Sequence, residues 1–234
     1  MSAMPGIPRH WQTIGVPGVL ERRYATYRPV PLHAMPPAGR AFDGTLGWLL
    51  DTPTHDRSLQ RGFDGPAERD ADAAGLHAIA PALPLPPAFR LFVEDPEPRR
   101  HVRSATACYL DLAHFTVLVS GGGVLIHFLS DQQWVLHWLL YLGPDGSEAV
   151  VVSPNPIGFD EGEGEPLHLV DLNAAQDWLA VCAETFEEFL YRYWIENELF
   201  FRLAVDQKSL DALPAELRAY AAAYPRDERQ PPEA

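Results

Sequence analysis

The chain has 234 residues, of which 47% are hydrophobic, and its 18 basic and 32 acidic side chains give a formal net charge of −14. This excess of acid opposes nonspecific binding to nucleic acid or to an anionic membrane, because both depend on basic groups. The longest strongly apolar run, 134–142, is about half of a membrane span, and the first residues show no secretory signal. The two cysteines form no CxxC motif, so we expect a cytoplasmic protein with reduced thiols.

The N-terminal third is predicted to contain little long regular structure. Seven prolines fall within residues 1–40, which leaves room for short extended pieces such as 21–27. Residues 51–75 are polar, charged and rich in turn formers, and we interpret them as a long loop. The expected organisation has three parts: a Pro-rich extension (1–75), a main domain with C-terminal helices (76–224) and a flexible tail (225–234).

A short helix is predicted near the start of the main domain. A proline of LPLPP can occupy its first turn, where the missing amide proton costs nothing. Phe89, Phe92 and Val93 then form one apolar face. Pro96 is expected to end the helix, because the residue before a proline avoids the α region.

Residues 104–170 predict a sheet. Short runs rich in β-branched and aromatic residues are separated by the turn-type connections AH, GGG, SDQQ and GPDG. Short connections favour antiparallel neighbours, so we predict a meander in which 134–142 is a central strand covered on both faces. The acidic run DEGEGE at 160–165 is expected to be a solvated loop before a last strand at PLHLV. A further extended piece, DWLAVCA, follows.

The clearest helix is predicted from about Thr185 to Val205. Thr185 and Glu188 match a capping box, and an apolar stripe follows them at helical spacing. Glu187 is expected on the solvated face. The pair Glu196 and Asn197 interrupts an apolar stretch and is expected either on that face or in contact with the sheet or a partner. A last helical segment, LPAELRAYAAAY, should end at the next proline.

One hairpin concentrates residues of the types that form catalytic or metal sites: His127, Asp131 and His137. If SDQQ is a four-residue loop, His127 pairs with Leu136 and the two histidines point to opposite faces. If the loop has three residues, His127 pairs with His137. Two imidazoles would still need a third zinc ligand. We interpret the stretch as a polar turn in which Asp131 bonds turn amides and the histidines are half-buried.

The order of these parts resembles the SUKH superfamily, which includes Smi–Knr-type cell-wall regulators and many bacterial immunity proteins. The matching pieces are LPPAF, GGGVLIHFLSDQQWVLHWLLYL and an A-x-x-F-x-x-F pattern at Ala183, Phe186 and Phe189, together about residues 83–205. The chain departs from the family at DPEPRRHVRS, where members often have an Asn-Gly-rich segment. The resemblance implies an α+β fold, with a single antiparallel sheet covered by helices, and no catalytic residues.

We therefore predict a non-catalytic intracellular protein-binding domain, and the resemblance implies an immunity-type protein that sequesters a toxin domain. The net charge favours a basic partner, and neither a cofactor, a metal, nucleic acid nor a membrane is expected. The alternatives are a hydrolase or metal-dependent enzyme using His127, Asp131 and His137, and a structural protein with an N-terminal binding arm. The candidate partner-binding residues are Asp160, Glu161, Glu163, Glu165, Glu196 and Asn197.

Overall fold

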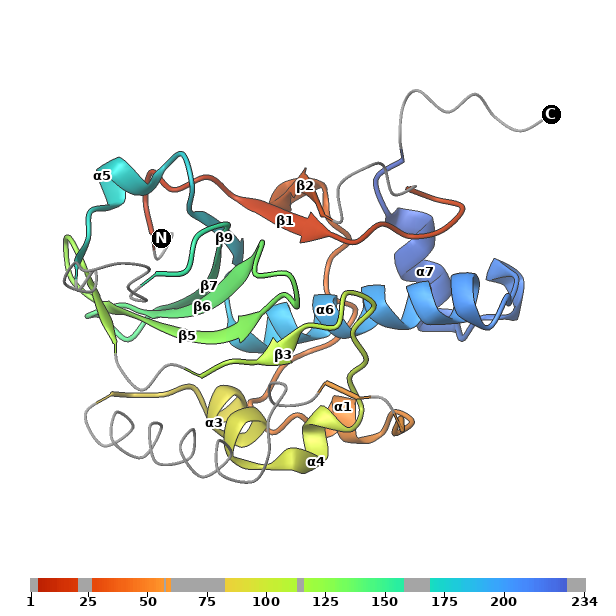
Figure 1. Cartoon of the computed structure of the whole chain (residues 1–234). Helices are drawn as coiled ribbons and strands as arrows, with labels where there is room; N and C mark the ends of the chain where they lie inside the picture. Colours follow the sequence, from red (N-terminus) through yellow and green to blue (C-terminus); the bar gives the residue numbers. More distant parts are fainter. Residues whose placement is uncertain are drawn as a thin grey trace.

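The computed structural model describes residues 4–20, 27–56, 58–59, 83–112, 116–157 and 169–226. It combines a curled seven-stranded sheet, a two-stranded sheet and several helices around a long helix, α6 (Figure 1). The strands are β1 (His10–Thr13), β2 (Arg28–Pro31), β3 (Tyr109–Leu110), β4 (Val117–Val119), β5 (Val124–Ser130), β6 (His137–Leu142), β7 (Glu148–Ser153), β8 (Leu169–Val170) and β9 (Ala180–Ala183). The helices are α1 (Gly47–Leu50), α3 (Pro87–Glu94), α4 (Pro96–Arg99), α5 (Leu172–Ala175), α6 (Phe186–Phe200) and α7 (Ala215–Ala223).

The large sheet is mixed and is not the single antiparallel meander that we predicted. Strands β4 to β7 do form consecutive antiparallel neighbours joined by short turns. However, β8 runs parallel to β4, β9 joins beyond β7, and β3 pairs with the far end of β5 rather than with β4. The long connection after β7 explains the difference, because only a long connection allows the chain to cross to the other edge and run parallel there.

The central strand β6 is buried on both faces, as predicted. Trp138 and Leu140 belong to the core that contains the α6 aromatics, whereas Leu139 and Tyr141 belong to a second core on the opposite face. Alternation of side chains along the strand explains this division. The sheet therefore lies between two separate hydrophobic layers.

The helix α3 confirms the interpretation of its prolines. Pro87 stands at its first turn, and Phe89, Phe92 and Val93 are buried on one face. The helix ends at Glu94, after which Asp95 has an extended backbone and caps α4.

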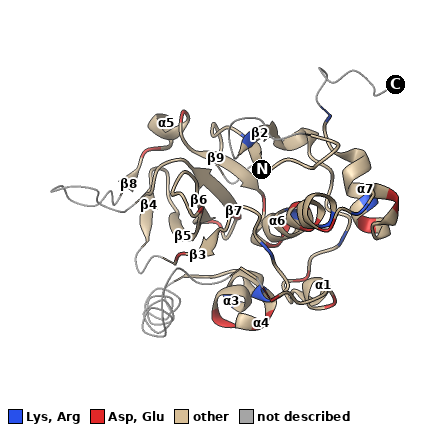
Figure 2. Cartoon of the chain, turned by 45° about the vertical axis from the view of Figure 1, so that its right-hand side comes forward, with Lys and Arg blue, Asp and Glu red and all other residues tan. Residues whose placement is uncertain are grey.

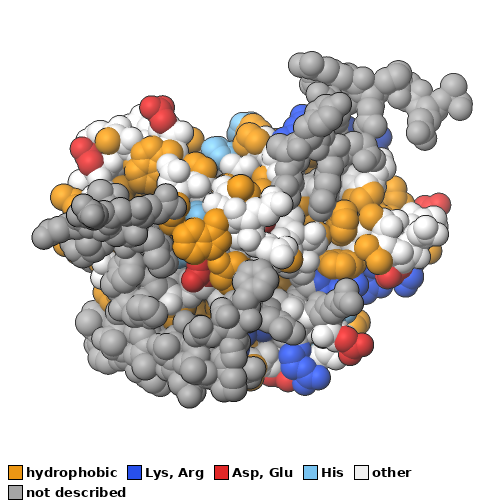
Figure 3. All heavy atoms as spheres, in the orientation of Figure 1, with side chains coloured by type: hydrophobic (Ala, Val, Ile, Leu, Met, Phe, Trp, Pro, Cys, Tyr) orange, Lys and Arg blue, Asp and Glu red, His pale blue; other side chains and the backbone are white. Residues whose placement is uncertain are grey.

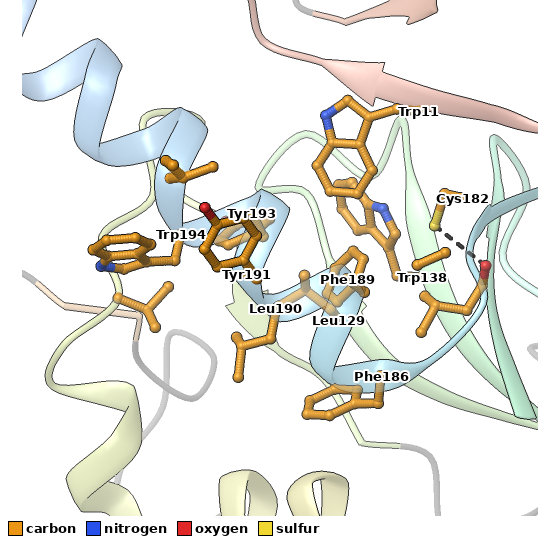
Figure 4. Close-up of a cluster of buried hydrophobic side chains, with 14 of the residues drawn as sticks. Trp11, Leu129, Trp138, Cys182, Phe186, Phe189, Leu190, Tyr191, Tyr193 and Trp194 are labelled. Atoms are coloured by element: carbon orange, nitrogen blue, oxygen red, sulfur yellow. Dashed lines mark hydrogen bonds between the residues drawn. The ribbon is translucent and has the colours of Figure 1, made fainter. Parts of the chain in front are cut away.

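The long helix α6 begins with the predicted cap, since the Glu188 amide donates to Thr185 Oγ1 at 3.1 Å. It does not continue as a regular helix to Val205, because 201–205 form a π-helical turn. Figure 4 shows Phe189 close to Trp11 and Trp138. Phe186, one turn earlier, packs against Phe128 of β5. The aromatic density of the helix is thus largely core packing.

The described parts of the first 75 residues pack on the same core. The amide of Val181 in β9 donates to the Pro8 carbonyl at 2.8 Å, and β1 pairs with β2. Arg40 forms two hydrogen bonds to Glu216 on α7 and stacks over Trp48 and Trp194. The expected extended piece at 21–27, apart from its last residue, and most of the 51–75 loop lie outside the described residues.

Candidate functional site at the turn between β5 and β6

The hairpin that carries the two histidines has a register that neither predicted loop length gives. Strand β5 ends at Ser130 and β6 begins at His137, and these two residues pair with each other. Towards the other end, His127 pairs with Leu139, and the register shifts between them through a bulge at Phe128. Both predicted pairings of His127 are therefore wrong, because the turn runs through 131–136 and the bulge adds a residue to β5.

The bulge brings a serine to the histidines. Phe128 and Leu129 both face the core that contains α6, so the alternation of side chains is interrupted between them. Ser130 consequently returns to the face that holds His127 and His137, although it lies three positions after His127 in the sequence. The two imidazoles contact each other with ring centroids 5.3 Å apart. Period-two reasoning from the sequence places Ser130 on the opposite face and misses this cluster.

The Ser130 hydroxyl is the centre of a buried hydrogen-bond network. It donates to Asp111 Oδ2 at 2.7 Å, and it lies 2.9 Å from both His127 Nε2 and His137 Nδ1. An ionised carboxylate only accepts, and the hydroxyl has one proton, so both imidazole nitrogens must donate to Oγ. His127 Nε2 also lies 3.2 Å from the Leu129 carbonyl, which can only accept, so this contact too requires the proton of His127 to be on Nε2.

The protonation and burial of the network differ from those of an activated serine. Burial lowers the pKa of His127 to about 4, so its imidazole is neutral at neutral pH. Activation of a serine nucleophile requires a histidine that accepts the hydroxyl proton, whereas here that proton goes to Asp111. Ser130 and His137 have no exposed surface. Among the described residues, no group of three or more His, Cys, Asp or Glu side chains is placed to hold a metal ion.

Asp131 does not join the histidines, so the predicted set of His127, Asp131 and His137 is not assembled. Its Oδ2 accepts from the Tyr27 hydroxyl at 2.7 Å, and its Oδ1 accepts from the Gln133 amide at 2.8 Å. This second bond confirms that Asp131 bonds the turn amides. The histidines, in contrast, are fully buried rather than half-buried.

The outer side of the turn presents an aromatic side chain that is both exposed and fixed. Trp134 is 42% exposed and has a left-handed backbone with φ of 58°. Its amide donates to the Asp131 carbonyl at 2.9 Å, its indole Nε1 donates to the Tyr109 hydroxyl, and its ring stands edge-on to His137. A left-handed conformation is rare for a bulky residue, and such strain concentrates at functional sites.

A second strained residue lies close to this turn in the hydrogen-bond network. Ala107, in the turn before β3, is exposed and has φ of 52°. Tyr27 links the two turns, since its hydroxyl bonds both Thr106 and Asp131. Two turns with unfavourable backbone conformations are thus linked by one partly buried tyrosine.

Glu187 is not on a solvated face as predicted. It is buried, and its carboxylate accepts from the Trp48 indole at 2.9 Å and from the Gly44 amide at 2.8 Å. Both donors come from the N-terminal region, which the helical pattern of α6 does not reveal.

Glu196 and Asn197 are also buried, which removes them from the predicted partner-binding surface in this conformation. Glu196 accepts hydrogen bonds from Thr13 at 2.9 Å and Tyr224 at 2.6 Å. Asn197 Oδ1 accepts from the Ala105 amide at 2.6 Å. They join α6 to distant segments of the chain.

The other predicted partner-binding residues, Asp160, Glu161, Glu163 and Glu165, lie outside the described residues and stay a prediction. Elsewhere, the described Asp and Glu residues are distributed over several elements rather than gathered on one (Figure 2). The exposed hydrophobic side chains visible in Figure 3 likewise form separate groups.

We expect the Ser130→Ala variant to lose roughly 2 kcal/mol of unfolding free energy, because the change leaves buried donors and a carboxylate without their shared partner. Urea denaturation of both proteins measures the difference. Ser147→Ala is the matched control, since it removes a hydroxyl that bonds the exposed Asp145, and its loss should stay below about 0.5 kcal/mol. Equal losses in the two variants would contradict a central role for Ser130.

No helix in the described part of the chain has the length and apolarity needed to cross a membrane. No protein-family model matches the chain, and no curated protein or solved structure is significantly similar to it. The resemblance to the SUKH superfamily therefore stays a prediction, and the function must be argued from the geometry of the turn.

Proposed function

We propose that the chain is a non-catalytic protein-binding domain that recognises its partner through the turn between β5 and β6. The recognition surface, called the turn surface below, consists of Ala107, Tyr109, Asp111 and the turn residues 132–135. The observation that carries the proposal is the state of Trp134, which is 42% exposed and yet fixed by three separate contacts in a strained conformation.

Preorganisation is the physical reason for a binding role. An exposed aromatic side chain that is already ordered loses little conformational entropy when a partner covers it. Tryptophan and tyrosine are enriched among the residues that contribute most to protein–protein affinity. The buried network of Ser130, His127 and His137 supports the base of the turn. We assign this cluster a structural role and no role in catalysis.

The proposed partner is a basic protein. The chain has a net charge of −14, and complementary charge speeds association more than it strengthens the final complex. By resemblance to the SUKH superfamily, we propose an intracellular immunity-type role in which the partner is a toxin domain. The acidic run at 160–165 would contribute to attraction, and neutralising it should slow association.

The second candidate function is a hydrolase centred on Ser130. One observation favours it: His127 and His137 lie together beside the carboxylate of Asp111. Two observations favour the binding role instead: the Ser130 hydroxyl donates to Asp111 and not to a histidine, and Ser130 is fully buried. A hydrolase would lose turnover of ester or phosphoester test substrates in a folded Ser130→Ala variant, whereas partner binding would persist.

Site-specific photo-cross-linking tests the proposed surface. A benzophenone amino acid replaces Val135, which is 44% exposed next to Trp134, in cells that contain the native partner. We expect one basic protein to be captured, with a yield that falls at least tenfold after the additional change Trp134→Ala and also falls with added salt. The same probe at Val205, which is 58% exposed on the π-helical turn, is the matched control.

The captured protein must then behave as a toxin for the immunity role to hold. Its expression should arrest growth, and the wild-type chain should restore growth where the Trp134→Ala variant does not. Equal capture from positions 135 and 205, or capture that ignores Trp134, would overturn the proposed surface. Capture of a protein with no toxic effect would overturn the immunity role alone.

A further inference from the structure

Three side chains of the turn surface belong to one connected group. The Asp111 amide donates to the Phe128 carbonyl at 2.9 Å, which continues the β3–β5 ladder past Leu110. Tyr109 and Asp111, two residues apart, therefore point to the same face, the face that also carries the paired residue Ser130. The Trp134 indole donates a hydrogen bond to the Tyr109 hydroxyl, and Asp111 accepts a hydrogen bond from the Ser130 hydroxyl.

The carboxylate of this group has no cationic counterpart within the described residues. Among the described residues, His127 Nε2 lies 3.8 Å from Asp111 Oδ2, and burial lowers the pKa of His127. No lysine or arginine of the described segments forms an ion pair with Asp111. The Asp111 side chain is 23% exposed, so its carboxylate reaches the protein surface on the same face as Tyr109, whose hydroxyl accepts from the Trp134 indole.

We propose that Asp111, Tyr109 and Trp134 form a binding site for an arginine side chain of the partner. This inference rests on the proposed function and specifies the chemistry of the same surface. An aromatic face attracts a cation, and a carboxylate beside it adds a charge-assisted hydrogen bond. Arginine fits better than lysine, because its planar guanidinium stacks on a ring while its N–H groups reach a carboxylate in the same plane.

The site differs from a simple acidic surface because hydrogen bonds fix the orientation of its carboxylate. The imidazoles of His127 and His137 lie beneath the carboxylate, and both donate to Ser130 Oγ. Because these N–H groups donate to Ser130 Oγ, the serine hydroxyl donates its proton to Asp111 Oδ2, and this hydrogen bond holds the carboxylate in one orientation. A preoriented carboxylate selects a ligand by geometry as well as by charge.

A titration with a minimal ligand tests the site directly. The full chain, labelled with ¹⁵N in its indole groups, is titrated with N-acetyl-arginine amide and followed by NMR. N-acetyl-citrulline amide is the matched control, because citrulline has the shape of arginine without its charge. We expect arginine to shift the Trp134 indole signal and citrulline to bind at least about tenfold more weakly. The other tryptophan signals serve as internal references.

The variant Asp111→Asn separates charge from structure. An asparagine carbonyl can still accept from Ser130, so the fold should be retained, while the affinity for the arginine ligand should fall about tenfold. Equal shifts with arginine and citrulline, no shift of the Trp134 signal, or unchanged binding by the variant would each overturn the arginine site. The cross-linking experiment at position 135 tests the proposed function separately. Capture of the partner there would support the proposed function even without an arginine site, and failure of that capture would contradict the proposed function whatever the titration shows.

Discussion

Replacing Glu196 by glutamine is expected to stabilise the chain, by roughly 1.5 kcal/mol at about pH 5.5 and roughly 3 kcal/mol at about pH 8.5. Glu196 is buried on α6, and burial raises the pKa of its carboxyl to about 7. Its unfolded-state pKa is near the ordinary value of 4.5. The buried carboxyl therefore favours its neutral form, which glutamine imitates permanently.

A count of protons supports the neutral form independently. Glu196, Thr13 and Tyr224 form three mutual oxygen–oxygen contacts. The two hydroxyl groups supply only two protons, so with an ionised carboxylate one contact has no proton. A protonated Glu196 can donate to Thr13, which then donates to Tyr224, which in turn donates to the other carboxyl oxygen, so that each of the three contacts has one proton. The glutamine amide can donate in the same place.

The sign of the pH effect follows from the raised pKa. As pH rises from about 4.5 to about 7, the unfolded chain releases the Glu196 proton before the folded chain does, so stability falls over this window and then stays constant. Denaturant titrations of wild type and Glu196→Gln across this range measure the difference. Because His127 titrates equally in both proteins, its contribution cancels. Parallel curves for the two proteins would refute the assignment.

Capping residues, prolines and short turns in the sequence were sufficient to predict the helices and strands whose ends they mark. The prolines around α3 fix its first turn and its end, and Thr185 with Glu188 marks the start of α6. The short turns between β4 and β7 dictate antiparallel pairing. The edge positions of β8 and β9 were not predictable in this way, because a long connection does not determine which edge the chain reaches.

The candidate site was predicted only in part, for two physical reasons. The bulge at Phe128 contains no glycine, so nothing in FLSDQQWVLHW indicates that alternation is interrupted and that Ser130 faces the histidines. The carboxylate of the cluster, Asp111, comes from another strand, whereas Asp131, which is closer in sequence, bonds the turn instead. Buried carboxylates on α6 were misplaced for a related reason, since their donors are far away in the chain.

Replacing Glu198 by glutamine is expected to cost roughly 3–5 kcal/mol of unfolding free energy, the largest effect that we predict. The Glu198 side chain is 2% exposed and lies 2.8 Å from Arg103 Nε, 3.0 Å from Arg202 Nε and 3.0 Å from His55 Nε2. Without the carboxylate, two partly buried guanidinium groups face each other with no counter-charge. The π-helical turn, which contains Arg202, and the segment around His55 should loosen together.

Glu216→Gln is the matched control, because it removes one carboxylate from an arginine pair whose side chains are 29% and 27% exposed. Solvent screens this pair, so its loss should be about 1 kcal/mol. Adding Arg202→Gln to Glu198→Gln should recover part of the lost stability, since one of the uncompensated charges is then gone. Urea denaturation of wild type, Glu198→Gln, Glu216→Gln, Arg202→Gln and the double variant tests this order. Strictly additive losses from Glu198→Gln and Arg202→Gln would mean that Glu198 stabilises the chain through packing and not by neutralising the two arginines.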